Sequence, residues 1–190
     1  MNMIYLIRHG QTDWNALGKM QGQTNIPLNE IGREQAKTAS IEVAKVKVEH
    51  IFSSNLDRAK ETSEIINGLL GLNLKIALDN RISEFCIGDF EGREWKTIPN
   101  DEWELFNSDR KKYNAETLDE IFARVKSFFD ELKQKNIKNA LVVTHTGTMR
   151  MMMYVAENNI FNTQDFIENY MRKLSFDNAQ LVEWKGGYNG

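Results

Sequence analysis

Short apolar runs alternate along the chain with longer stretches in which apolar residues recur every three or four positions. Four of these runs are typical of buried strands, and they cover residues 3–7 (MIYLI), 50–53, 73–77 and 140–143 (ALVV). Two further short strands are predicted over residues 174–176 and 180–184, as a hairpin or as an edge of the sheet. We expect these strands to form one sheet.

Helical spacing fills the intervals between the strands, beginning with residues 30–46. The next helix presents small or apolar side chains on one face, at Leu56, Ala59, Ser63, Ile66 and Leu70. Ser54 or Asn55 is placed to cap its N-terminus, and Gly71 is placed to end it. Two later helices follow the same spacing, at Leu118, Ile121, Val125, Phe128 and Leu132 and at Met149, Met152, Met153 and Ala156. We interpret the methionines as core packing rather than as a soft-metal site.

Residues 89–114 interrupt this alternation, because their aromatic and charged residues show no clean period. We expect this segment to be an excursion over the sheet, inside a single domain that spans residues 1–190. Strands that alternate with helices predict an α/β fold whose sheet is covered on both faces. In such sheets, ligands bind beyond the carboxyl ends of the strands.

The composition is that of an ordinary globular protein, with 41% apolar and 27% charged residues and a net charge of −3. This charge argues against nucleic acid and anionic membranes as general partners, so any bound anion must meet a local positive cluster. The single cysteine, Cys86, cannot form an internal disulfide, and its side chain is expected to pack as a small hydrophobe. Without a signal peptide or an apolar run of about 20 residues, the chain is expected to be cytosolic.

Two of the three histidines share one arrangement, an apolar run followed by a histidine and a glycine. His9 follows residues 3–7 and His145 follows residues 140–143, so both lie just past a predicted strand. Because the carboxyl ends of parallel strands meet at one edge of a sheet, these two side chains could reach one site. The third histidine, His50, has no polar companions and is expected to be structural or exposed.

Charged neighbours suggest what such a site would bind. Arg8 beside His9 is a fixed cation at a strand end, which is costly to bury unless an anion meets it. Arg58 lies in the first turn of a predicted helix, where unpaired N–H groups and the helix dipole also favour anions. Glu84 lies in a glycine-containing loop, and a carboxyl group beside a phosphate is a plausible general acid.

Together these residue types describe a phosphoryl-transfer pocket that needs neither a metal nor another cofactor. Guanidinium groups would hold the phosphate oxygens, one imidazole would act as the nucleophile, and a carboxyl group would supply a proton. Zinc ligation by His9, His145 and Glu84 is a competing use of the same side chains, which the adjacent Arg8 would oppose. The chain has no GxxxxGK[ST] loop, so an ordinary ATP-dependent kinase or ATPase is not expected.

The same segments resemble the histidine phosphatase superfamily, the phosphoglycerate mutase-like family, over nearly the whole chain. The stretch LIRHGQTDWNALGKMQGQTNIPLNEIGREQA, residues 6–36, is similar to the opening signature of that family. Three further blocks match it, namely SSNLDRAKET (residues 53–62), EFCIGDFEG (residues 84–92) and VVTHTGTMR (residues 142–150). The resemblance implies a three-layer αβα sandwich with a mostly parallel sheet and a small inserted cap, matching residues 89–114 in place.

The resemblance also implies roles for individual residues. His9 would be the nucleophile that becomes phosphohistidine, Glu84 would protonate the departing oxygen, and Arg8, Arg58 and His145 would surround the phosphoryl group. Substrate binding is assigned to Asn15, Gln21, Gly22, Thr146 and Gly147. Two positions depart from the family pattern, because Thr146 stands where a glycine is usual after the second histidine and Gln11 stands where glutamate is common.

The expected activity is that of a histidine acid-type phosphatase acting on a small phosphomonoester, with ribazole phosphate-type and broad-specificity enzymes both fitting. A phosphoglycerate mutase is the alternative, disfavoured because mutases carry longer insertions. A non-catalytic phosphate-binding module is a further alternative. The inserted residues offer aromatic side chains for a substrate ring or for a local core (Trp95, Trp103, Phe106 and Tyr113) and cations for a second anion or for solvent (Lys96, Arg110, Lys111 and Lys112). No oligomeric state is predicted.

Overall fold

A computed structural model describes residues 3–184 and contains one five-stranded sheet. The strands are β1 (Ile4–Arg8), β2 (His50–Ser53), β3 (Ile76–Leu78), β4 (Ala140–Thr144) and β5 (Leu181–Trp184), in the order β3-β2-β4-β1-β5. Every neighbouring pair is parallel except β1 and β5, which are antiparallel. The predicted α/β class and mostly parallel sheet are therefore confirmed.

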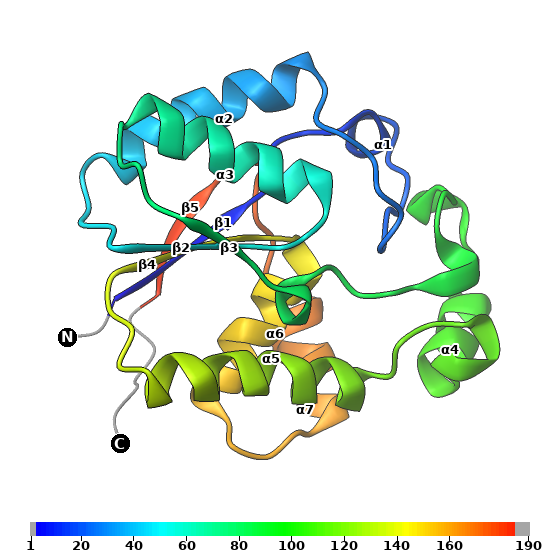
Figure 1. Cartoon of the computed structure of the whole chain (residues 1–190). Coiled ribbons are helices and arrows are strands. Elements are labelled where there is room, and N and C mark those ends of the chain that lie inside the picture. Colours follow the sequence, from blue (N-terminus) through cyan, green and yellow to red (C-terminus); the bar gives the residue numbers. More distant parts are fainter. Residues whose placement is uncertain (1–2, 185–190) are drawn as a thin grey trace.

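Helices cover both faces of the sheet and make the three layers (Figure 1). On one face lie α2 (Glu30–Val43) and α3 (Asp57–Leu69), and on the other lie α5 (Leu118–Gln134), α6 (Thr146–Glu157) and α7 (Thr163–Phe166). The short α1 (Asp13–Ala16) follows β1, and a π-helical turn, Ile167–Met171, continues α7. Within residues 3–184, no helix combines the length and the apolar character that crossing a bilayer requires.

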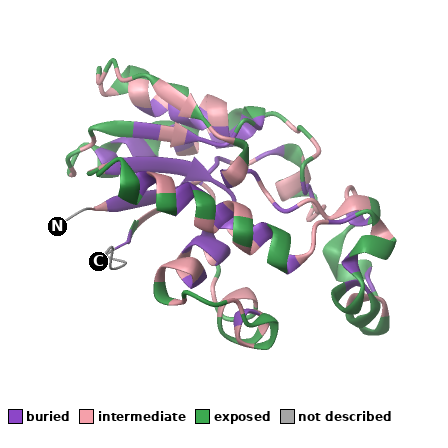
Figure 2. Cartoon of the chain, turned by 60° about the horizontal axis from the view of Figure 1, so that its bottom comes forward, coloured by how far each residue is buried: buried purple, intermediate pink, exposed green. Residues whose placement is uncertain are grey.

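Alternating strand residues divide the core into two clusters. In β1, Ile4 and Leu6 face α5 and α6, whereas Tyr5 and Ile7 face α2 and α3. The strands are correspondingly buried and the outer helix faces exposed (Figure 2). The predicted stripe on α5 is buried throughout. Of the predicted stripe on α6, Met149 and Met152 are fully buried, whereas Met153 and Ala156 are half-buried and pack against the same core.

Residues 89–114, called the inserted segment below, lie beside the carboxyl ends of the strands and contain α4 (Asn100–Ser108) (Figure 1). This segment has its own apolar cluster, centred on Phe90, Ile98 and Phe106. Aromatic rings hold the cluster together, with the rings of Phe90 and Phe106 4.4 Å apart between centroids. The segment therefore packs largely on itself.

Four local predictions were wrong. Residues 174–176 form no strand, β3 starts at Ile76 rather than at residue 73, and α2 ends at Val43 rather than at residue 46. Leu56, not Ser54 or Asn55, is the N-cap of α3 and makes no side-chain cap bond. Ser54 Oγ accepts the N–H of the N-cap residue Leu56 at 3.2 Å and also meets His145, whereas Asn55 accepts from Ser83. Asn25 from a distant loop accepts the Asp57 N–H through Oδ1 at 2.8 Å.

Candidate active site

Strand register brings the two predicted site histidines together. β1 and β4 are hydrogen-bonded parallel neighbours in which Arg8 pairs with Thr144, so the next residues, His9 and His145, leave the sheet side by side. Their ring centroids lie 5.1 Å apart. This is within the reach of one phosphoryl group, which both rings could contact.

The ring of His9 is held in one tautomer. Its Nδ1 lies 2.6 Å from the carbonyl oxygen of Gly10, and because a carbonyl only accepts, Nδ1 carries the proton in the neutral ring. The lone pair is then on Nε2. Burial, reinforced by the charges of Arg58 and Arg8, holds the pKa of His9 well below 6.5. His9 is therefore neutral at pH 7, as a nucleophile must be.

Gly10 allows this turn to pack closely. A Cβ at Gly10 would collide with the backbone carbonyl of Gly32, at the start of α2. The Gly10 N–H donates to Thr62 Oγ1 of α3 at 3.1 Å, so the loop that follows β1 is tied to both helices on that face. The glycine of the RHG triplet is thus required by packing.

Arg58 is fully buried in the first turn of α3 and holds the adjacent loop. Its two terminal nitrogens donate to the carbonyls of Thr24 and Gly22, at 2.8 and 2.7 Å. Burial lowers the pKa of Arg58 to about 10, which leaves the group charged at neutral pH. Arg8 is held similarly, since its Nη1 donates to the Phe176 carbonyl at 2.6 Å, and burial lowers its pKa.

His145 lies behind His9, with no exposed surface, at the N-cap of α6. Its Nε2 lies 2.8 Å from Oγ of Ser54, the residue that follows β2 on the other side of β4. If the Ser54 hydroxyl donates this bond, the remaining proton of the neutral imidazole is on Nδ1. Burial and the charge of Arg58 hold the pKa of His145 well below 6.5.

The carboxyl group of Glu84 is seated on the N-terminus of α6. It accepts backbone N–H groups from Phe85, Gly147 and Thr148, at 3.0, 3.2 and 3.2 Å. A Cβ on Gly147 would lie 2.6 Å from Glu84 Oε1, so only glycine lets the carboxyl group come this close. Gly147, which follows His145 by two positions, therefore makes room for the Glu84 carboxyl group.

Unpartnered buried atoms gather at this site. Among residues 3–184, only five buried side-chain nitrogen or oxygen atoms lack a hydrogen-bond partner. Four of them belong to predicted site residues, namely Arg8 Nε, Arg58 Nε, His145 Nδ1 and Thr146 Oγ1. Because buried polar groups are nearly always satisfied, this concentration of unpartnered atoms, two of them on guanidinium groups, marks the place where an anion would be bound.

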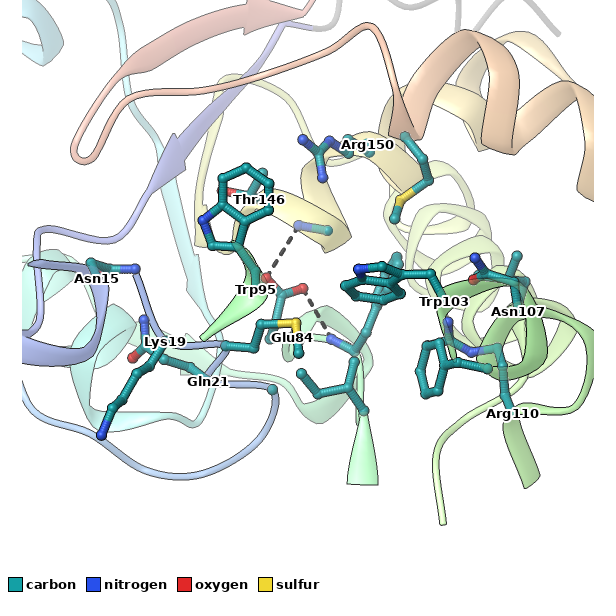
Figure 3. A pocket seen from close by; sticks show the side chains of 18 of the residues that line it. Asn15, Lys19, Gln21, Glu84, Trp95, Trp103, Asn107, Arg110, Thr146 and Arg150 are labelled. Carbon is teal, nitrogen blue, oxygen red and sulfur yellow. Dashed lines mark hydrogen bonds between the residues drawn. The ribbon is translucent and has the colours of Figure 1, made fainter. Parts of the chain in front are cut away.

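These residues border a cavity of about 800 Å³. Its lining includes the predicted Arg8, His9, Asn15, Gln21, Gly22, Arg58, Glu84, Thr146 and Gly147. His145 is not among the lining residues, and its ring lies beside that of His9. Asn15 and Lys19 lie on one side of Glu84, and Trp103, Asn107 and Arg110 lie on the other (Figure 3).

Two contributors to the site were not anticipated from the sequence. Arg150 lines the cavity one helical turn after Thr146 and donates from Nε to the Leu174 carbonyl at 2.8 Å. The i, i+4 spacing from Thr146 on a predicted helix is the signal that could have revealed it. Ser54 was assigned to a helix cap, and no pattern in the sequence connected it with His145.

The inserted segment supplies the far wall of the cavity. Trp103, Phe106 and Arg110 line it there, whereas Tyr113 packs in the local cluster against Phe90. Trp95 also lines the cavity, but beside Gly18, whose carbonyl accepts its N–H at 3.2 Å. Lys96, Lys111 and Lys112 do not line it, and Lys111 pairs with Glu120. Across residues 3–184, no three His, Cys, Asp or Glu side chains gather as a metal site would require.

Comparison with known proteins agrees with this geometry. A family profile described as the histidine phosphatase superfamily (branch 1) matches residues 4–183. The chain belongs to this superfamily. Thr146, the first residue of α6, carries one of the unpartnered buried atoms, its Oγ1.

Relatives within the superfamily carry both phosphatase and mutase names. A Hydrogenobacter thermophilus protein named as a candidate phosphoserine phosphatase is 32% identical over 189 residues, covering 96% of this chain and 89% of its own. The phosphoglycerate mutase-like protein 4 of Arabidopsis thaliana is 33% identical, covering 78% and 68%. A solved mycobacterial glucosyl-3-phosphoglycerate phosphatase shares the fold, with a TM-score of 0.81, 24% identity and coverage of 96% and 90%.

Proposed function

We propose that this member of the superfamily is a phosphatase that hydrolyses small phosphomonoesters through a phosphohistidine on His9. The observation that carries the proposal is the set of four unpartnered buried polar atoms, on Arg8, Arg58, His145 and Thr146, beside a neutral His9 whose Nε2 is free to attack. Donors that are already in place stabilise a phosphoryl group most when its charge spreads over three equatorial oxygens. Asn15, Gln21 and Gly22 would hold the ester from the loop after β1.

In the first half of the reaction, His9 Nε2 forms a bond to phosphorus. The phosphorus–oxygen ester bond breaks, its electron pair stays on the leaving oxygen, and the carboxyl group of Glu84 supplies the proton that this oxygen takes up. In the second half, Glu84 as a carboxylate removes a proton from water. The water oxygen bonds to phosphorus, the nitrogen–phosphorus bond breaks, and its electron pair returns to Nε2.

The name of the relative that aligns along 96% of this chain supports hydrolysis rather than mutase activity. A mutase returns the phosphoryl group to a bound sugar acid, and the mutase-like relative keeps that reaction as the second candidate. A histidine acid-type classification and a cytosolic location belong to the same proposal. The non-catalytic phosphate-binding module is the third candidate.

Assays with and without EDTA, on two kinds of phosphate ester, separate these three candidates. The protein should hydrolyse p-nitrophenyl phosphate at an undiminished rate in the presence of EDTA, and rapid quenching should trap a phosphoenzyme that acid destroys and alkali preserves. Loss of activity with EDTA would instead indicate a bound metal. Isomerisation of 3-phosphoglycerate that depends on added bisphosphoglycerate would indicate the mutase, and inertness toward all esters would indicate the binding module.

A further inference from the structure

The fifth unpartnered buried atom lies across the cavity from Asn15 and Lys19 (Figure 3). It is Nη2 of Arg110, whose side chain lines the cavity from the inserted segment and is 6% exposed. The guanidinium group lies near Trp103 and Asn107, across the cavity from Asn15 and Lys19 (Figure 3). The four other unpartnered atoms serve the phosphoryl group, so this one calls for a separate explanation.

Arg110 is held rigidly but is not neutralised. Its Nε donates to the Glu116 carbonyl at 2.5 Å, and its Cζ lies 4.4 Å from the centroid of the Phe106 ring. The nearest carboxylate, that of Glu116, already pairs with Arg124 at 2.9 Å and accepts the Cys86 N–H. No carboxylate forms an ion pair with Arg110 among the described residues. Burial lowers the pKa of Arg110 to about 10, so the group stays charged at neutral pH.

A buried guanidinium without an anion is costly, and proteins keep one where a ligand supplies the missing charge. The loop that carries Glu84 fixes Arg110 relative to the phosphoryl end, because Arg124 donates both to the Glu84 carbonyl and to the Glu116 carboxylate. The lining also includes apolar side chains, among them Met20, Ile87 and Phe106, of which Phe106 packs against the Arg110 guanidinium. A molecule that spans the cavity thus meets cations at both ends, and passes Glu84 and apolar side chains on the way (Figure 3).

We propose that Arg110 binds a second negatively charged group of the substrate, so that the preferred substrate is a phosphomonoester with a carboxylate or a second phosphate across an apolar body. This inference rests on the proposed function, because it places the scissile phosphate at His9. Nε is already engaged with Glu116, so Nη2 makes a single charge-assisted hydrogen bond, which either anion can accept.

The test compares matched esters within each protein. The probes are 4-(carboxymethyl)phenyl phosphate, its uncharged methyl ester and 4-(phosphonomethyl)phenyl phosphate. In the wild-type protein, kcat/KM for the carboxylate should exceed that for the methyl ester about tenfold to hundredfold, as a hydrogen bond to a charged group allows. The phosphonate arm shows which anion the site prefers.

Arg110→Met should bring this ratio close to one, and Arg110→Lys should restore part of it. Lys112→Met is the matched control, because it removes an exposed cation two residues away that does not line the cavity, and it should keep the wild-type ratio. Each ratio is measured on one preparation, so it does not depend on the fraction of the variant that folds. A wild-type ratio near one, or an unchanged ratio in Arg110→Met, would overturn the assignment.

Binding provides a readout that does not require turnover. The His9→Ala protein should bind the intact carboxylate ester about tenfold or more tightly than the methyl ester, measured by titration calorimetry. If no phenyl phosphate is hydrolysed by the wild-type protein, the proposed function fails while this affinity ratio still decides the assignment of Arg110. Equal affinities for the two esters would reject it.

Discussion

At one end of the cavity, His9 and His145 follow neighbouring parallel strands, whereas at the other end Trp103 and Arg110 belong to a segment that packs on its own aromatic cluster. The first set is positioned by sheet register, and its donors are tied to backbone carbonyls of several loops. Trp103 and Arg110, in the inserted segment, can be substituted without disturbing the sheet. We therefore expect substitutions at the strand ends to change kcat, and substitutions in the inserted segment to change KM and substrate preference.

The largest effect is expected at the strand ends, from His9→Ala. Removing the attacking Nε2 should lower kcat on p-nitrophenyl phosphate at least about a thousandfold and abolish the trapped phosphoenzyme. His50→Ala is the control, because His50 is exposed and lies at the start of β2, away from the cavity lining. Full activity in the His9→Ala protein would refute the nucleophile assignment and, with it, the division between the two ends.

Glu84→Gln should have the next largest effect, and the effect should depend on the leaving group. An alkoxide needs a proton on departure, so kcat on an alkyl phosphate should fall about a hundredfold or more. Nitrophenolate leaves without one, so phosphorylation of His9 should proceed and the phosphoenzyme should accumulate as a burst measured by rapid quenching.

The matched control for this prediction is Glu104→Gln, which changes an exposed carboxyl group of α4. Its kinetics on both esters should match those of the wild-type protein. Equal losses on the alkyl and nitrophenyl esters, with no burst, would show that Glu84 acts on something other than the leaving oxygen.

A smaller effect is expected from Trp95→Ala in the inserted segment. Trp95 lines the cavity yet is 54% exposed, which suits a ring that stacks on an aryl substrate. Losing this ring should raise KM for aryl phosphates roughly two- to tenfold and leave kcat nearly unchanged. Trp95→Phe should retain most of the affinity. A fall in kcat comparable to that of Glu84→Gln would show that the two ends are not independent.

The same contrast explains how much of the molecule could be predicted. Buried parallel strands and amphipathic helices have strong periodicity, so the sheet, its layers and the meeting of His9 with His145 followed from the pattern. Arg8 was singled out as a fixed cation at a strand end, Arg58 by its place in the first turn of a predicted helix, and Glu84 by its glycine-containing loop. The family resemblance supplied the roles that these residues would play.

The features that were missed depend on contacts between distant parts of the chain. Asn25 accepts the Asp57 N–H at the start of α3 from a loop some thirty residues away, and Ser54 Oγ meets His145 as well as the Leu56 N–H. Capping preferences of neighbouring residues cannot predict contacts between residues that are so far apart in the chain. In the inserted segment, the sequence could not decide which cations face the cavity, because Arg110 lines it and its neighbours Lys111 and Lys112 do not.

Changing pH between 7.5 and 5.5 should act mainly on the strand ends, because the inserted segment contains no histidine. The pKa values of His9 and His145 both lie well below 6.5 in the folded protein. Both rings thus stay neutral as the pH falls to 6.5, and kcat/KM on p-nitrophenyl phosphate should show no loss from histidine protonation down to that pH. A steep loss of kcat/KM between pH 7.5 and 6.5 would contradict this expectation.

The free energy of unfolding should also depend on pH between 7.5 and 5.5. Below about pH 6.5 the unfolded chain takes up protons at these two histidines while the folded protein does not, so the free energy of unfolding should fall as the pH falls. Paired carboxyl groups such as Glu102 and Glu131 have pKa values held below 4.5, so their contribution is lost only at lower pH. Urea unfolding at pH 7.5 and 5.5 should therefore show lower stability at pH 5.5. His145→Asn should reduce the difference in stability between pH 7.5 and 5.5, whereas His50→Ala should leave the contribution of the buried pair, His9 and His145, intact. A free energy of unfolding that does not change with pH in the wild-type protein would show that this pair does not titrate as proposed.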